Sequence, residues 1–219
     1  MTRLLLTLLL AVVTVPLGYA QTSPVGREQA LADATLKGDV ERVRAIIAAG
    51  ALDFAKDVTA AGTTYPLTRF VIEVSQGALP GDGPRAGDTR VLEIVRALFA
   101  AGANPNFSWE QSAARSTSST TYWVVERVAA RDDTALLDVL IDAGLDVKGA
   151  GAGEALITAA ERGHATVVAR LIAAGADVNH RQRKSGRTAL SEAVHMGRRE
   201  VIALLDAAGA REWVEPPPK

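Results

Sequence analysis

A nine-residue motif with apolar residues at helical spacing recurs five times along the chain. It is VRAIIAAGA from Val43, VRALFAAGA from Val95, LDVLIDAGL from Leu137, VARLIAAGA from Val168 and IALLDAAGA from Ile202. Apolar side chains three and four positions apart share one face of an α-helix. The glycine near the end of each motif suits the left-handed conformation that closes a helix. Each copy therefore predicts a helix with one buried face and a glycine at its end.

The spacing of these glycines defines a repeating unit. They stand at positions 50, 102, 144, 175 and 209, so the intervals are 52, 42, 31 and 34 residues. The last two intervals indicate a unit of about 33 residues, and the first two indicate insertions. A shorter alanine-rich segment precedes the motif, as in EALITAAERGH and TALSEAVHMGR, and Gly163 or Gly197 joins the two. The predicted unit is a pair of antiparallel helices followed by an extended loop.

The most regular units are GEALITAAERGHATVVARLIAAGADVN and GRTALSEAVHMGRREVIALLDAAGA. They resemble ankyrin repeats, whose pattern is roughly G-x-T-P-L-H-x-A-A-x-x-G-H-x-x-V-V-x-L-L-x-x-G-A-D-V-N. The resemblance extends over residues 27–213 and is weaker in the first three units, where Pro66-Leu67 follows an intruding Tyr65 and Val124-Val125 replaces the Pro-Leu pair. It implies an all-α solenoid of about five helix-turn-helix units with short finger loops. The units span about 27–58, 59–107, 116–149, 150–182 and 183–213.

The fifth unit differs from the others in a way that predicts the end of the stack. One position of the motif holds an apolar residue in the first four units, namely Ile47, Phe99, Ile141 and Ile172. The fifth unit has Asp206 there. A terminal repeat needs a polar outer face because no neighbour covers it. We therefore expect Asp206 to lie on the C-terminal face, with residues 214–219 as a Pro-rich tail.

Two insertions lengthen the middle of the chain. The first predicts a turn-rich loop from Gln76 to Asp88, between the two helices of the second unit. The second, NPNFSWEQSAARSTSSTTY, extends the finger before the third unit. Phe107 and Trp109 lie in this polar stretch with no helical period to bury them. As loop aromatics they are candidate partner contacts, with the alternative that they fold back over the stack as a lid.

The resemblance implies that partners bind to the fingers and to the inner face of the first helices. Trp123 stands where the family has Thr, and we expect it in the core. By repeat position and loop location, the candidate partner-binding residues are Tyr65, Arg69, Phe107, Trp109, Tyr122, Glu161, Arg162, Lys184, Arg187, His195 and Met196.

The first twenty residues have the pattern of an export signal. Arg3 precedes an apolar run from Leu4 to Val15, Pro16 ends that run, and Ala20 closes a small-residue cleavage site. We expect a signal peptide over 1–20, a short linker over 21–26, and a periplasmic or secreted protein. An uncleaved membrane anchor is the alternative, although the run is short for a bilayer of about 30 Å. The absence of Cys excludes disulfides and lipid attachment to Cys, and favours a bacterial periplasm.

Charge and motifs argue against several other functions. The 24 Lys and Arg balance 25 Asp and Glu, and no segment is basic enough for nucleic acid. His164, His180 and His195 lack metal-ligand spacing; we expect His164 at a turn and the other two in solvent. The GAGAG segment at 149–153 lacks the Lys of a phosphate loop and predicts an inter-repeat turn. We expect no metal, no cofactor, no small-molecule substrate, no membrane contact after signal cleavage, and no catalysis.

The sequence therefore predicts a protein-binding module that recognises an exported or incoming protein. Bacterial proteins of the family it resembles include companions of periplasmic antioxidant enzymes and immunity proteins against toxins from rival cells. The alternatives are a membrane-tethered structural protein of the envelope and an enzyme with a site in the two insertions, using Asp88, Glu110 or His195.

Overall fold

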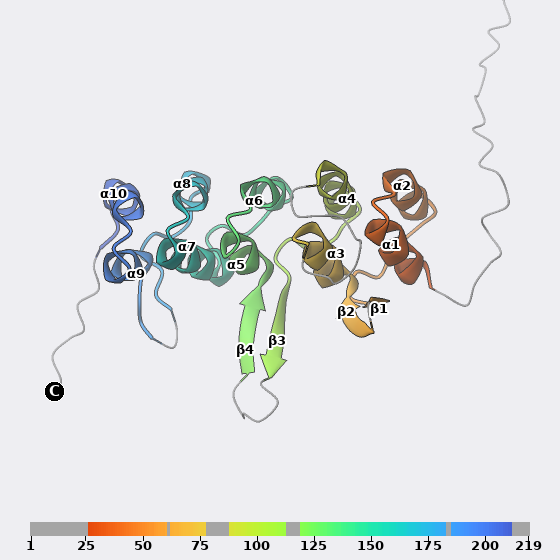
Figure 1. Cartoon of the computed structure of the whole chain (residues 1–219), viewed down its shortest axis with the longest axis horizontal. Helices are drawn as coiled ribbons and strands as arrows, with labels where there is room; N and C mark the ends of the chain where they lie inside the picture. Colours follow the sequence, from red (N-terminus) through yellow and green to blue (C-terminus); the bar gives the residue numbers. More distant parts are fainter. Residues whose placement is uncertain (1–25, 61, 78–87, 113–118, 183–184, 212–219) are drawn as a thin grey trace, which may run out of the picture.

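The computed structural model describes residues 26–60, 62–77, 88–112, 119–182 and 185–211. Within these ranges the chain forms five helix pairs that stack side by side (Figure 1). The signal peptide, most of the 76–88 loop, Lys184 and the 214–219 tail lie outside the described residues. The pairs are α1 (Arg27–Leu36) with α2 (Val40–Ala48), α3 (Leu67–Ser75) with α4 (Thr89–Ala100), α5 (Val124–Ala129) with α6 (Thr134–Asp142), α7 (Ala150–Arg162) with α8 (Ala165–Ala174), and α9 (Ala189–His195) with α10 (Arg199–Ala207).

The five pairs confirm the predicted helical solenoid, with two corrections in the fingers. Hairpins stand where we expected a short loop before the second unit and an extended finger before the third: β1 (Asp57–Ala60) pairs antiparallel with β2 (Thr63–Pro66), and β3 (Ser108–Ser112) with β4 (Ser119–Trp123). Figure 1 shows the first helix of every pair in one row, the second helices in another, and both hairpins projecting from the first-helix side. Threonine and aromatic residues, which favour strands, are frequent in these segments.

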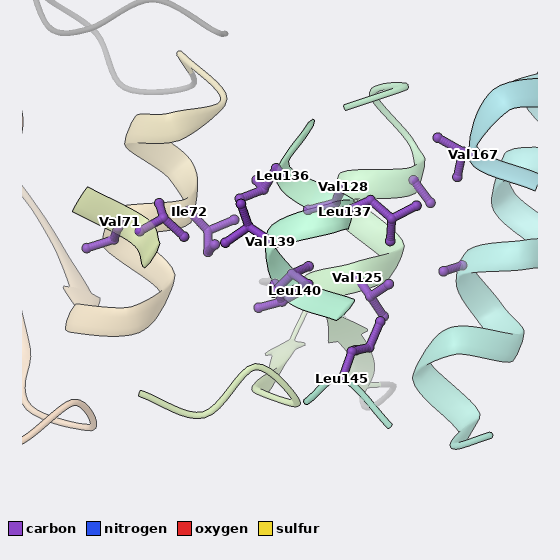
Figure 2. Packing of buried hydrophobic residues seen from close by; sticks show 14 of the residues in the cluster. Val71, Ile72, Val125, Val128, Leu136, Leu137, Val139, Leu140, Leu145 and Val167 are labelled. Atoms are coloured by element: carbon purple, nitrogen blue, oxygen red, sulfur yellow. The ribbon is translucent and has the colours of Figure 1, made fainter. Parts of the chain in front are cut away.

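The core runs along the interfaces between neighbouring pairs. The first motif position is at most 1% exposed in four repeats, at Val43, Val95, Leu137 and Val168, but its equivalent Ile202 is only half-buried. This position therefore faces the following repeat. The residue just before it is buried in repeats two to five, at Ile94, Leu136, Val167 and Val201, whereas Arg42 in the first repeat is exposed. Each second helix thus packs against both neighbours, as Figure 2 shows around repeat three, where Ile72 and Val167 lie on opposite sides of α6.

The C-terminal face of the stack has the polarity that the sequence predicts at Asp206. Ile47, Phe99, Ile141 and Ile172 are half-buried and pack on the core, while Asp206 is exposed. Burying a charge without a partner is costly, so the aspartate occupies the one copy of this position that no repeat covers. Asp133 caps α6, as its place before that helix favours, by accepting a hydrogen bond of 3.0 Å from the Leu136 N–H.

The GAGAG segment is helical, which corrects the predicted turn. Helix α7 begins at Ala150 and includes Gly151 and Gly153, both buried. A Cβ added at Gly151 would come within 2.9 Å of the Trp123 ring, and one added at Gly153 would overlap the imidazole of His180. These glycines therefore serve close packing, with ring atoms in the space where a side chain would stand.

The three histidines differ in exposure. His180 is half-buried against α7, so our expectation of a solvated side chain was wrong. His195 is exposed, as predicted. His164 stands at the turn before α8, makes no capping hydrogen bond, and has Nδ1 3.9 Å from the carboxylate of Asp132 in the preceding repeat.

Candidate binding surface

The structure gathers four of the predicted contact residues into one cluster at the base of the two hairpins. Arg69 of α3 lies between Tyr65 of β2 and Trp109 of β3: its guanidinium carbon is 5.5 Å from the tyrosine ring centre and 4.7 Å from the tryptophan ring centre. Phe107 stacks on Trp109 with 6.2 Å between ring centres. Cation–π contacts of this geometry are attractive. Arg69 therefore connects two hairpins that belong to different repeats.

The position of the aromatic residues follows from strand geometry. Side chains two residues apart in a strand point to the same side, which brings Phe107 and Trp109 together. Both are half-buried and pack against the core. The register pairs Trp109 with Tyr122, whose side chain is outside the described set. Trp123, one residue further, is half-buried against α7, consistent with the core position that we expected.

A buried carboxylate lies beside this cluster. Glu73 of α3 is 4% exposed, with Oε1 3.6 Å from Nε of Arg69 and Oε2 2.7 Å from Nη2 of Arg127 on α5. Arg131 adds a second link between α3 and the third repeat, donating a 2.9 Å hydrogen bond from Nη1 to the carbonyl of Gln76. Removing one partner from a buried ion pair is strongly destabilising. The arginines therefore hold the repeats at a fixed spacing beneath the hairpins.

The surroundings of Glu126, on α5, change the pKa of its carboxyl group. Burial is the largest effect and raises the pKa of Glu126, and the negative charge of Glu154 raises it further. Hydrogen bonds with the Trp123 backbone and with Thr158 lower the pKa and offset part of this increase. The net effect is a pKa above the ordinary value of 4.5. The folded state thus binds this proton more tightly than the unfolded chain does.

We expect Glu126→Gln to increase the free energy of unfolding at pH 7. Protonation of Glu126 favours folding fully below pH 4.5, and this contribution is lost as the pH rises through the raised folded-state pKa. The amide imitates the protonated form, so its advantage over wild type should disappear in acid. Urea denaturation between pH 4 and pH 8 measures this. Glu200→Gln, at an exposed site on α10, serves as control; a constant difference across this pH range would contradict the expectation.

The remaining predicted contacts lie in the last two repeats. Glu161, Arg162, Arg187, His195 and Met196 are all exposed. Arg187 donates from Nη1 to the buried Glu192 at 2.8 Å, and the backbone carbonyl of Glu161 accepts from Nε of Arg198 at 3.0 Å. The structure therefore divides the predicted site into an aromatic cluster and a separate C-terminal group.

The C-terminal group includes an exposed residue that sequence reasoning missed. Val194 is 46% exposed, next to Met196 at 42%. By alignment at the left-handed residue that ends the first helix, which is Gly197, Gly163 or Asp132, its counterparts are Ala160 and Ala129, both fully buried. Val194 belongs to the last repeat among the described residues, and the end of the repeat pattern was the signal that could have identified its exposure.

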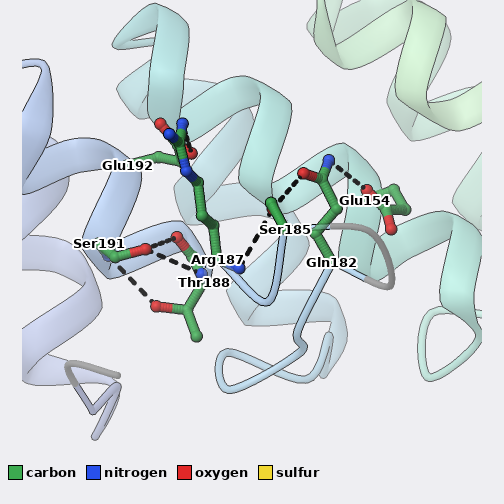
Figure 3. A network of polar contacts seen from close by, with 7 residues as sticks. All are labelled: Glu154, Gln182, Ser185, Arg187, Thr188, Ser191 and Glu192. Carbon is green, nitrogen blue, oxygen red and sulfur yellow. Dashed lines mark hydrogen bonds and ion pairs between the residues drawn. The ribbon is translucent and has the colours of Figure 1, made fainter. Parts of the chain in front are cut away.

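A polar network fixes the finger between repeats four and five (Figure 3). Gln182 donates to Glu154 at 3.1 Å and accepts from Ser185 at 2.5 Å. Thr188 and Ser191 form a reciprocal capping box at the start of α9. These bonds connect Gln182 with α7 and Thr188 with Ser191 at the start of α9, and Arg187 lies beside them.

The described residues contain no group of three or more His, Cys, Asp or Glu side chains placed to hold a metal ion. A cavity of about 80 Å³ lies between Phe107, Trp123, Leu145 and the start of α7, and ligand pockets are usually larger, at roughly 300 Å³ or more. Within the same ranges, no helix has both the length and the apolar composition needed to cross a bilayer.

Comparison with known proteins agrees with the repeat geometry. Residues 126–213 match the family model described as ankyrin repeats in three copies. The fold is similar to the crystal structure of an ankyrin repeat domain from Acinetobacter baumannii AYE, with 25% identity and a TM-score of 0.57, covering 87% of this chain and 89% of that one. No curated protein matches the sequence.

Proposed function

Because the chain is an ankyrin repeat protein, we propose that it is a protein-binding module of the bacterial periplasm that recognises an exported or incoming protein. Ankyrin repeats are generally protein–protein interaction modules. The cavity beside Phe107 and Trp123 is small, at about 80 Å³, and the fold presents side chains on hairpins and first helices. A surface of this kind suits a macromolecular partner better than a small substrate.

The observation that carries the proposal is the cluster around Arg69. Arginine, tryptophan and tyrosine are the residues that most often dominate binding energy at interfaces. Here they come from two adjacent repeats and hold one another in place through ring and guanidinium contacts. A partner meeting such a surface orders few side chains on binding, so less conformational entropy is lost.

The location rests on the N-terminal pattern. Arg3, the apolar run and Ala20 support export, and the lack of Cys suits a protein that uses no disulfide outside the cytoplasm. Mass spectrometry of protein purified from a bacterial host tests this directly. We expect a mature N-terminus at Gln21. Protein that retains Met1 would instead support the membrane-tethered alternative.

Two kinds of partner correspond to the bacterial ankyrin proteins named above: an antioxidant enzyme and a toxin. A companion of an antioxidant enzyme predicts that a deletion strain becomes sensitive to hydrogen peroxide. An immunity protein predicts that the deletion strain is poisoned by a toxin encoded nearby.

We expect a Trp109→Ala, Tyr122→Ala variant to lose most of its partner capture from periplasmic extract. The two residues are opposite each other in the β3–β4 ladder, and loss of an aromatic anchor commonly costs about 2 kcal/mol or more, equal to about thirtyfold in affinity. Quantitative mass spectrometry of the captured proteins measures the loss. Arg96→Ala, at an exposed position on the outer helix α4, is the matched control. Equal capture by wild type and the double variant, with both folded by circular dichroism, would show that the hairpin is not the binding surface.

A further inference from the structure

Two arginines and one carboxylate leave a positive charge at the centre of the candidate surface. Arg69 and Arg127 flank Glu73, with one guanidinium at each carboxylate oxygen. The Glu73 side chain is 5% exposed, whereas those of Arg69 and Arg127 are 26% and 33% exposed. The three ionised groups sum to a charge of +1. The negative group is covered and the positive groups reach solvent, so a partner meets the positive charge.

Arg69 keeps part of its side chain in solvent although it contacts two rings and a carboxylate. The rings of Tyr65 and Trp109 lie at 5.5 and 4.7 Å from its central carbon. The buried Nε faces Glu73 at 3.6 Å, too far for a hydrogen bond. The Arg69 side chain as a whole is still 26% exposed, so part of it reaches solvent. The N–H groups of its two terminal nitrogens lie in the guanidinium plane and match the two oxygens of a carboxylate.

We propose that Arg69 and Arg127 bind an acidic segment of the protein partner, with an Asp or Glu carboxylate at the terminal edge of Arg69. This inference rests on the proposed function and specifies the chemistry that the surface selects. Ring contacts hold the guanidinium in place, so less side-chain entropy is lost when the carboxylate binds. A short acidic segment fits a local charge of +1, whereas nucleic acid requires many cations to neutralise a row of phosphates.

The test uses the full mature chain and a defined probe. The probe is a fluorescein-labelled ten-residue peptide of alternating Glu and Gly, and its partner is the same peptide with Gln in place of Glu. Fluorescence anisotropy at low and high salt measures both affinities. We expect wild type to bind the Glu peptide at least tenfold more tightly than the Gln peptide, with the preference falling as salt screens the charges.

Three variants separate carboxylate recognition from a structural role. Arg69→Lys keeps the charge but loses the planar fork, and should weaken Glu-peptide binding about tenfold. Glu73→Gln raises the local charge from +1 to +2 and should tighten binding several-fold, a direction opposite to the effect of simple damage. If Arg69→Lys does not fold, Arg127→Lys tests the same loss of a planar guanidinium at the second arginine. Arg96→Gln on α4 removes an exposed cation from the outer helices and should leave binding unchanged.

Several outcomes would overturn the inference. These are equal affinity for the two peptides, weaker binding by folded Glu73→Gln, or tighter binding of a twenty-nucleotide single-stranded DNA than of the Glu peptide. Partner capture from periplasmic extract distinguishes failure of the acidic-segment inference from failure of the proposed protein-binding function. A captured partner together with no Glu-peptide preference would refute the acidic segment alone, and no captured partner would refute the proposed function.

Discussion

Replacing Leu137 with alanine is expected to lower the free energy of unfolding by about 2–5 kcal/mol, the range for truncating a buried leucine. Leu137 is 0% exposed and faces the following repeat. The Ala variant loses apolar contact and leaves a cavity between repeats three and four. Because each repeat of a solenoid contacts only its neighbours, a loss at one interface weakens the coupling of the whole stack.

The repeat pattern supplies a matched control at Ile202. It occupies the same motif position in the last repeat but is only half-buried, because the described residues include no further repeat to cover it. Ile202→Ala should therefore cost clearly less, about 1 kcal/mol, in proportion to the smaller apolar area that it buries. Urea denaturation followed by circular dichroism measures both. Equal losses at the two positions would contradict the assignment of this row to the interface with the following repeat.

The second large effect is expected for Gly153→Ala, with a loss of about 1–3 kcal/mol from overpacking. In most helix interiors this substitution is stabilising by about 1 kcal/mol. Here the added Cβ would overlap the ring of His180, beginning at Cγ, the ring atom closest to the histidine backbone. Rotation of the ring about the Cβ–Cγ bond leaves Cγ in place, so either the His180 side chain leaves its χ1 rotamer or the finger shifts.

Removing the ring tests this cause. In a His180→Ala background, the space opposite Gly153 is open, and Gly153→Ala should become neutral or stabilising. Thermal melts of the four proteins in this double-mutant cycle give the coupling energy. If Gly153→Ala costs the same in both backgrounds, contact with the imidazole is not the reason for glycine at this position.

These stability effects bear on binding because the candidate surface spans repeats. Tyr65 precedes α3 and Trp109 precedes α5, and Arg69 contacts both rings. The spacing of the rings depends on the packing between repeats two and three. Variants that loosen this interface should weaken partner binding even where they touch no contact residue.

Sequence reasoning identified the exposed residues of the site by their repeat positions, but it did not identify the contacts between repeats. Arg187 in the finger, and His195 and Met196 at the end of α9, are exposed, as their repeat positions indicated. No periodicity indicated that Arg69 would meet Trp109, forty residues away. The turn predicted for GAGAG failed because glycine was taken as a loop signal, whereas Gly151 and Gly153 give room to Trp123 and His180.

The sequence by itself determined the helix pairs, their number and the polarity of the last repeat. Each of these depends on local periodicity, on glycine conformation, or on whether a charge can be buried. Only the tertiary structure decided which side chains from different repeats meet. The ion pairs of Glu73, the position of Arg69 between two rings, and the exposure of Val194 depend on packing between separate segments. These contacts join residues that are far apart in the sequence, and the local sequence pattern does not specify which of them lie close together in space.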